Sequence, residues 1–189
     1  MRPTGQGPAV ASEADGRDSF LVLIVCAANT ARSVMAEHLL RLALERRGAA
    51  GLVAVRSAGI APYARDGALV SLDARMALQA QGIALPEDQT STDLKRHPDL
   101  LAEADLVLAM TAEQAALLNA QFPVPAGAPV ATLGEFAGRP GDIADPAEKG
   151  SAAFAACCRE LAALIPGVAE RVLQQVDEGS HASAVRKPS

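Results

Sequence analysis

The sequence predicts an α/β fold, a three-layer sandwich around a four-stranded parallel sheet. Short apolar runs alternate along the chain with amphipathic stretches, an order typical of parallel strands with helices on both faces of their sheet. The longest runs are unbroken, as expected for strands that are buried on both sides. The chain has 189 residues, of which 50% are hydrophobic and 21% charged, and this composition suits one folded domain.

Four short apolar segments are the predicted strands. Residues 20–25 form the run Phe-Leu-Val-Leu-Ile-Val, which is too short for a helix. Residues 105–110 form a second run of this kind, and shorter segments follow the same pattern at 52–55 and 129–132. These segments predict a sheet of four strands.

The first two predicted helices each end at a glycine. Residues 33–47 end before Gly48 and residues 68–81 before Gly82, and glycine is preferred just beyond a helix. The buried face of the second helix is expected to carry Leu69, Leu72, Met76 and Ala80.

The last part of the chain predicts two helices around a long loop. Thr111 is a natural N-cap for a helix over residues 112–120. Residues 133–150 hold four Gly and two Pro and are expected to form a loop. A final helix starts at Ser151, and Pro166 is expected to kink or restart it. Its buried stripe is predicted to comprise Phe154, one of Cys157 and Cys158, Leu161, Leu164, Ile165, Val168 and Val172.

One domain is predicted over residues 19–176, with a disordered leader at 1–18 and a flexible tail at 177–189. The leader lacks the apolar stretch of a secretory signal, and no apolar run approaches the ~20 residues that span a bilayer. The net charge of −5 argues against a broad nucleic-acid surface, and three cysteines, an odd number, favour a reducing compartment. We therefore expect a cytoplasmic protein without nucleic-acid or membrane partners.

The loop after the first strand carries the strongest chemical signal. Ligands of an open parallel sheet bind beyond the carboxyl ends of its strands. At the first such end the chain reads Cys26, Ala27, Ala28, Asn29, Thr30, Ala31, Arg32 and Ser33. Backbone N–H groups of a loop and a helix start favour an anion, and they also favour Cys26 as a thiolate. Arg32 offers bidentate donors that match a phosphoryl group, and Ser33 can hydrogen-bond the sulfur.

These residues fit a cysteine that attacks a tetrahedral oxyanion. The alternative is that Cys26 is a small buried residue ending a strand, and Arg32 a solvated charge. A cation at a helix start opposes the helix dipole, however, and a residue that breaks a local rule is often functional. The spacing of Cys26, Arg32 and Ser33 therefore favours catalysis.

The pattern Cys26-x5-Arg32-Ser33 after an apolar strand resembles the phosphate-binding loop of low-molecular-weight protein tyrosine phosphatases. Other segments resemble the same family in the same order: Met35-Ala36-Glu37, Leu39-Leu40-Arg41, Ser57-Ala58-Gly59, residues 104–111 and Asp142-Ile143-Ala144-Asp145-Pro146. The resemblance covers residues 20–175 and implies the family's fold, which matches the predicted sandwich.

The resemblance also implies catalytic roles. Cys26 would be the nucleophile that forms a phosphocysteine, and Arg32 would bind the phosphoryl oxygens. Asp145 would protonate the leaving group and later activate water. An ordinary Asp-Pro turn is the alternative for Asp145, but a covalent two-step mechanism needs an acid.

Further residues gain supporting roles from the resemblance. Asn29 and Ser57 would brace the loop, and Tyr63 would line the substrate cleft. The implied partner is a phosphorylated protein, and no cofactor is implied. No metal is expected either, because His38, His97 and His181 lack ligand spacing with the cysteines, and the pair Asp142 and Asp145 lacks a third ligand.

The chain departs from the family pattern at several positions. Ala28, Ala31 and Val34 stand where the family usually has Gly, Cys and Pro, and Ala147 and Glu148 follow Asp-Pro in place of an aromatic wall. The missing aromatic weakens the case for phosphotyrosine. Thr30 resembles relatives that act on phosphoarginine, although a small β-branched filler is the alternative interpretation.

The predicted function is a metal-independent protein phosphatase that hydrolyses phosphotyrosine or phosphoarginine through a cysteinyl-phosphate intermediate. A non-catalytic phosphate-binding module of the same fold is the alternative, kept open by Ala28, Ala31 and Ala147. An arsenate reductase has less support, since its further thiols would have to come from Cys157 and Cys158, over 130 residues downstream. The sequence does not indicate an oligomeric state.

Overall fold

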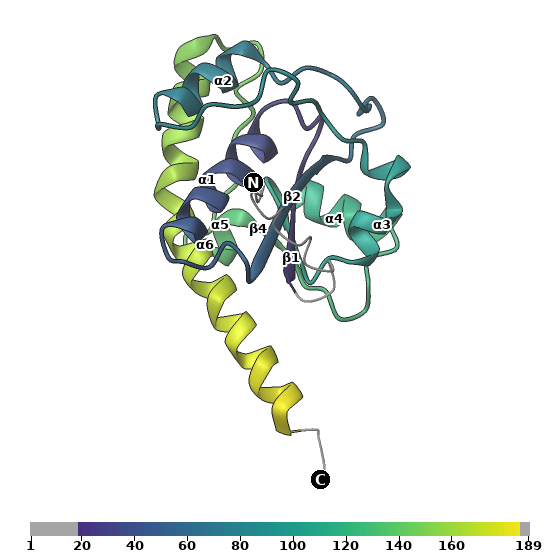
Figure 1. Ribbon diagram of the computed structural model, residues 1–189. Coiled ribbons are helices and arrows are strands. Elements are labelled where there is room, and N and C mark those ends of the chain that lie inside the picture. The colour runs from purple at the N-terminus through teal and green to yellow at the C-terminus, as the bar shows by residue number, and fades with distance from the viewer. Residues whose placement is uncertain (1–18, 186–189) are drawn as a thin grey trace, which may run out of the picture.

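The computed structural model describes residues 19–185, so the predicted leader and the last four residues of the predicted tail lie outside the described residues. Four parallel strands form one sheet in the order β2-β1-β3-β4, with helices on both faces (Figure 1). The predicted fold class is therefore confirmed. The strands are β1 (Phe20–Cys26), β2 (Val53–Gly59), β3 (Leu106–Ala109) and β4 (Val130–Thr132).

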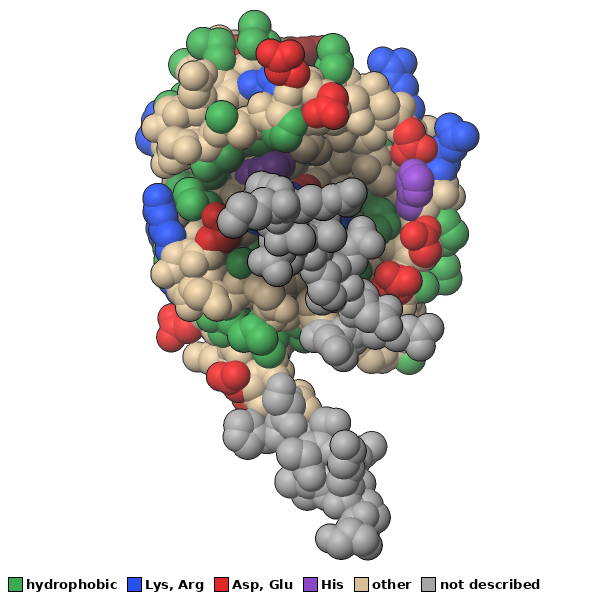
Figure 2. Space-filling view, viewed as in Figure 1, with side chains coloured by type: hydrophobic (Ala, Val, Ile, Leu, Met, Phe, Trp, Pro, Cys, Tyr) green, Lys and Arg blue, Asp and Glu red, His purple; other side chains and the backbone are tan. Residues whose placement is uncertain are grey.

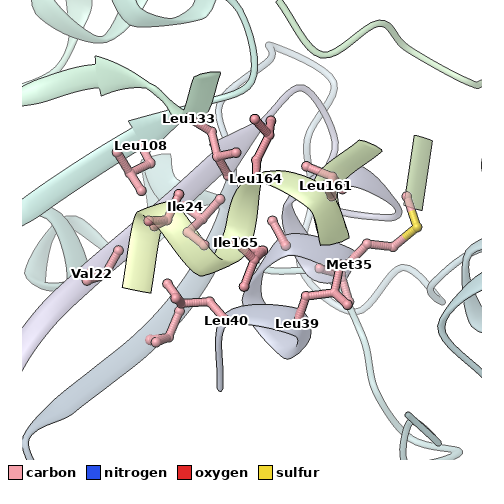
Figure 3. Packing of buried hydrophobic residues seen from close by; sticks show 14 of the residues in the cluster. Val22, Ile24, Met35, Leu39, Leu40, Leu108, Leu133, Leu161, Leu164 and Ile165 are labelled. Atoms are coloured by element: carbon pink, nitrogen blue, oxygen red, sulfur yellow. The ribbon is translucent and has the colours of Figure 1, made fainter. Parts of the chain in front are cut away.

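The central strand β1 joins two packed layers. Its Val22 and Ile24 belong to the core formed with α1 (Arg32–Glu45), α2 (Leu72–Gln79) and α6 (Ser151–Val185). Its Leu23 and Val25 point to the other face and belong to the core formed with α3 (Pro98–Ala102) and α4 (Ala112–Gln121). Figure 3 shows the first of these cores, where Leu161, Leu164 and Ile165 of α6 lie against residues of α1 and the sheet.

The parallel pairing places the carboxyl ends of β1, β2 and β3 at the same end of the sheet. β1 pairs with β2 along its whole length, from Phe20 opposite Val53 to Cys26 opposite Gly59. On its other side β1 pairs with β3, where Val25 lies opposite Ala109. Because all strands are parallel, the segments that follow β1, β2 and β3 emerge at the same edge.

The helix α2 differs from its prediction in start and in buried face. It begins at Leu72, capped by Ser71, whose Oγ accepts the N–H of Ala74 at 3.1 Å. The preceding residues are instead extended, with a bridge between Leu69 and Thr90. The predicted face was wrong: Leu69, Leu72, Met76 and Ala80 are exposed, while Ala74, Ala77 and Leu78 are buried. Small alanines allow α2 to lie close against α6.

The expected loop over residues 133–150 is interrupted by a short helix, α5 (Leu133–Phe136). A capping box opens it: Thr132 Oγ1 accepts the N–H of Glu135, and a Glu135 carboxylate oxygen accepts the N–H of Thr132, both at 3.1 Å. This Thr-x-x-Glu pattern is a helix-start signal that is visible in the sequence. A 3-10 turn, Leu94–Arg96, precedes α3.

The last helix begins at Ser151 as predicted and carries the predicted stripe into the core. It continues through Pro166 without restarting, and Figure 1 shows its axis changing direction between its two halves. Both Cys157 and Cys158 are buried, so the expectation that one lies outside the stripe was wrong. The helix α6 packs against three other helices, α1, α2 and α5.

Within the described residues, α6 is also the one helix whose length and apolar composition would suffice to cross a membrane. This differs from the expectation that no segment approaches that length. Its apolar stripe is occupied by core contacts, which is the arrangement of a core helix. The predicted domain ended at residue 176, whereas the helix continues to Val185. Figure 2 shows acidic and basic side chains interspersed on one face of the molecule.

Candidate active site

The predicted cysteine loop lies against the end of β2. The N–H of Ile60 donates to the carbonyl oxygens of Cys26 at 3.0 Å and Ala27 at 3.1 Å. A Cβ added to Gly59 would lie 2.9 Å from the Ala27 carbonyl oxygen and 2.9 Å from the Ala28 carbonyl carbon, closer than real Cβ atoms come. Glycine at position 59 is therefore what lets the loop approach β2 so closely.

Hydrogen-bonding groups surround the sulfur of Cys26. The Sγ atom lies 2.9 Å from Ser33 Oγ, and it accepts the backbone N–H of Asn29 at 3.3 Å. The helix α1 starts at Arg32 with no side-chain cap and no acidic residue in its first turn. Uncapped N–H groups and the positive end of the helix dipole favour an anion at this point.

A buried chain of hydrogen bonds supports the loop from behind. Asn29 adopts a left-handed backbone, with φ of 58°, which asparagine tolerates better than most residues. Its Nδ2 donates to Ser33 Oγ at 2.9 Å and to Ser57 Oγ at 2.8 Å. Its Oδ1 accepts the N–H of Thr92 at 2.8 Å. The structure thus brings the predicted residues Asn29, Ser33 and Ser57 into direct contact.

Glu37 and Arg41 extend this chain, and from the sequence they were noted only as parts of a helix motif. Ser57 Oγ donates to Glu37 Oε2 at 2.5 Å, and the other carboxylate oxygen pairs with Arg41 at 2.6 Å. Burial raises the pKa of Glu37, although the charge of Arg41 and the Ser57 hydrogen bond act in the opposite direction. The available signal was an acidic residue within an apolar stretch of helix.

Arg32 connects the cysteine loop with the predicted acid loop. Its guanidinium is almost fully buried, pairs through Nη2 with Asp145 and donates through Nη1 to the Ile143 carbonyl at 2.9 Å. Ile143 is buried, and its N–H donates to the Met110 carbonyl at 2.8 Å, which fastens the acid loop to the end of β3. The side chain of Asp145 remains 50% exposed.

These residues line one cleft of about 500 Å³. The predicted site residues on its wall are Cys26, Ala27, Ala28, Thr30, Ala31, Arg32, Tyr63 and Asp145. Asn29, Ser33 and Ser57 do not line the cleft. They support its lining residues through the hydrogen bonds described above. Asp73 and Glu148 are further acidic residues that line the cleft, and Asp73 was not expected there from the sequence.

The departures from the family pattern are accommodated locally. Among the described residues other than glycine, the left-handed conformation occurs at Asn29 and Glu148 and not at Ala28. An alanine at position 28 therefore carries no such backbone strain. Ala147 is exposed at the cleft and supplies no ring after Asp145-Pro146; the aromatic residues that line the cleft are Tyr63 and Phe154.

Asp142 and Asp145 do not form a pair. Asp142 Oδ1 accepts the N–H of Ala112 at the start of α4, at 2.9 Å, whereas Asp145 contacts Arg32. In the described part of the chain, no group of three or more His, Cys, Asp or Glu side chains is arranged to hold a metal ion. Burial raises the pKa of the Cys157 thiol to about 12 and also raises that of Cys158, which leaves both as poor thiol relays.

Comparison with known proteins identifies the family. Residues 21–178 match the family model described as low molecular weight phosphotyrosine protein phosphatase. The chain belongs to this family. It is a metal-independent protein phosphatase, and the cysteinyl-phosphate mechanism is general for such enzymes, as predicted; Cys26 is present at the end of the first strand.

Two similar relatives and one solved structure carry a more specific name. A protein-arginine-phosphatase of Geobacillus stearothermophilus is 36% identical over 154 residues, which cover 81% of this chain and 96% of the relative. A protein-arginine-phosphatase of Bacillus subtilis (strain 168) is 38% identical over 126 residues, covering 66% of this chain and 78% of the relative. The structure of the YwlE arginine phosphatase, a cysteine-to-serine mutant with a phosphorylated active-site serine, is similar with a TM-score of 0.72 at 33% identity. That similarity covers 81% of this chain and 95% of the other.

Proposed function

We propose that this phosphatase hydrolyses phosphoarginine in proteins, in the cytoplasm. The observation that carries the proposal is the acidic lining of the cleft: Asp73, Asp145 and Glu148 line the same wall as Cys26. A guanidinium is a cation, and carboxylates are its natural partners. A phenyl ring would gain from an aromatic residue directly after Asp145-Pro146, and Ala147 supplies none there, although Tyr63 and Phe154 line other parts of the cleft. The names of the two curated relatives point to the same substrate.

Cys26, Arg32 and Asp145 are assigned the three catalytic roles. The Cys26 thiolate attacks phosphorus, the phosphorus–nitrogen bond breaks, and Asp145 donates a proton to the departing guanidine nitrogen. Water then attacks the phosphocysteine while Asp145 takes up a proton, so that phosphate leaves and the thiolate is regenerated. In support of these roles, a relative with serine in place of its active-site cysteine holds the phosphoryl group on that serine.

The pairing of Arg32 with Asp145 suggests how the acid is released. A bound phosphoryl group competes for the Arg32 guanidinium, because bidentate phosphate contacts are strong. Asp145 then turns from Arg32 toward the leaving nitrogen. Arg32 keeps its orientation through the Ile143 carbonyl at 2.9 Å. Asn29 and Ser57 hold the loop in place during both steps.

The cytoplasmic assignment rests on cysteine chemistry. Cys26, Cys157 and Cys158 are all free. A nucleophilic thiolate has to stay reduced, and Ala31 leaves Cys26 without the neighbouring thiol of many relatives.

The decisive experiment compares kcat/KM for a phosphoarginine peptide and for the matching phosphotyrosine peptide, with EDTA present. We expect phosphoarginine to be hydrolysed at least as fast. Thr30, which lines the cleft with Cys26, is the variant position. Thr30→Ile should lower the phosphoarginine rate and spare or raise the phosphotyrosine rate. Equal changes in both rates, or no phosphoarginine turnover by the parent, would leave a phosphotyrosine phosphatase as the better assignment.

A chromogenic aryl phosphate distinguishes the enzyme from a phosphate-binding module. Turnover in EDTA that depends on Cys26 supports the enzyme. Phosphate binding without turnover of any of the three substrates would support the module.

A further inference from the structure

A second groove opens beside the catalytic cleft. It has a volume of about 690 Å³ and lies between the segment Ile60, Ala61 and Pro62, which follows β2, and one face of α4. It shares the residues Ala27, Arg32, Tyr63 and Asp145 with the cleft that contains Cys26. The two are therefore continuous at the end where the phosphoryl group binds.

The wall formed by α4 is low and apolar. Ala116 and Ala120 lie one turn apart and are exposed, and the partly buried Leu117 lies between them. The groove follows the helix from Thr111 to Ala120, a distance of ~13 Å at the rise of an α-helix. An extended polypeptide covers that distance with about four residues.

Charge makes the groove selective. Glu113 and Asp145 are its acidic side chains, and Arg32 is the one basic side chain among the described residues that line it. Arg32 pairs with Asp145 in the structure and holds the phosphoryl group once substrate is bound, so in neither case does it offer a free positive charge to an acidic flanking side chain.

We propose that this groove binds an apolar side chain of the substrate polypeptide, close in sequence to the phosphorylated residue. The inference rests on the proposed function in one respect, namely that a phosphorylated side chain of a protein enters the cleft of Cys26. The flanking backbone then lies at the mouth, where Tyr63 and Asp145 border both hollows. An apolar side chain that continues into the groove leaves water and covers Ala116, Ala120 and Pro62, which is favourable. An acidic side chain in the groove would be repelled by the carboxylate of Glu113.

Matched phosphoarginine peptides test this subsite. Each flanking position is changed in turn to Leu, Ser or Asp in a peptide that is otherwise Gly and Ala. We expect kcat/KM about tenfold higher for Leu than for Ser at one flanking position, and lowest for Asp there, since one apolar contact in a pocket typically discriminates by that factor. Free phosphoarginine serves as the substrate without flanking residues.

Protein variants show whether the groove causes the preference. Ala116→Phe and Ala120→Phe fill it, whereas Asn119→Phe adds the same ring to an exposed position of α4 that does not line it. The first two should remove the preference for Leu, mainly through KM, and leave hydrolysis of free phosphoarginine unchanged. Asn119→Phe should retain the preference. Circular dichroism checks that all three variants fold.

Two failures can be distinguished. Absence of phosphoarginine turnover by the parent protein would count against the proposed function, and the same peptides carrying phosphotyrosine then test the groove. Equal rates for Leu, Ser and Asp at every flanking position would overturn the subsite, as would a Leu preference that survives both Ala116→Phe and Ala120→Phe.

Discussion

The two sides of the catalytic cleft are held in different ways. The cysteine loop is fixed from within, since Asn29, Ser33 and Ser57 are buried and hydrogen-bonded to one another. The acid loop is fastened at Ile143, but its Asp145 is half exposed and is held by Arg32 and by the N–H of Ala147, at 3.0 Å from the latter.

This difference separates two requirements of the reaction. Binding a phosphoryl group requires donors that are already in place, and buried hydrogen bonds provide that rigidity. Transferring a proton requires a group that can change partners, and a half-exposed carboxylate such as that of Asp145 can exchange a partner for water. We therefore expect changes in the cysteine loop's support to affect stability and rate together, and changes at Asp145 to affect mainly the rate.

Removal of the nucleophile should have the largest effect. Cys26→Ser should lower turnover by about 10⁴-fold or more, because a hydroxyl in this loop is far less acidic than a thiol. Initial rates with an aryl phosphate measure the loss, and circular dichroism checks the fold. Activity retained by the folded variant would rule out the covalent mechanism.

Removal of the acid should come next and should depend on the leaving group. Asp145→Ala should slow substrates with basic leaving groups by about 10²–10⁴-fold and a nitrophenyl phosphate much less. The midpoint of urea unfolding should fall much less than the rate, since Asp145 is half exposed and the buried Arg32 keeps the Ile143 carbonyl as a partner.

Asp142→Ala is the matched control for this loop. It removes the acceptor for the N–H of Ala112, so it should cost about 0.5–2 kcal/mol of stability without changing the leaving-group dependence. An equal loss of rate for good and poor leaving groups in Asp145→Ala would place the acid elsewhere.

Loss of a buried contact behind the cysteine loop should lower both stability and rate. Ser57→Ala removes one of the two acceptors of Asn29 Nδ2 and the hydroxyl donor to Glu37. Leaving buried polar groups without partners costs about 1–3 kcal/mol. Urea unfolding and kcat measure the two effects, with Ser151→Ala as the control because that hydroxyl contact is exposed. If Ser57→Ala and Ser151→Ala lost equally little stability and kcat, the cysteine loop would not be held more rigidly than the acid loop.

The pH dependence of stability should reveal Glu37, with the smallest effect. Because burial raises its pKa in the folded state, the folded protein holds this proton more tightly than the unfolded chain. Protonated Glu37 therefore contributes fully to the free energy of unfolding below the ordinary glutamate pKa of about 4.3. This contribution declines as the pH rises through the pKa that Glu37 has in the folded protein. The stability of the parent relative to Glu37→Gln should thus fall between acidic and neutral pH, measured by urea unfolding. A difference that stays constant or grows with pH would show that the pKa of Glu37 is not raised.

Several features followed from short stretches of sequence. Cys26, Arg32 and Ser33 come together because a strand, a tight loop and a helix start follow one another within eight residues. The stripe of α6 was equally predictable from its spacing. The capping box of Thr132 and Glu135 was also local, and it was missed because the surrounding glycines favoured a loop.

Other features depended on contacts between distant segments. Asp145 reaches Arg32 across 113 residues, and Ser57 reaches Glu37 across 20, because the strand order brings these segments to one edge of the sheet. The buried face of α2 was set by the alanines that fit against α6, whereas Leu72 and Met76 had the stronger apolar signal. Local sequence specifies caps, turns and periodicity through torsional preferences and neighbouring hydrogen bonds. Which faces are buried, and which charges meet, depends on the close packing of the assembled layers.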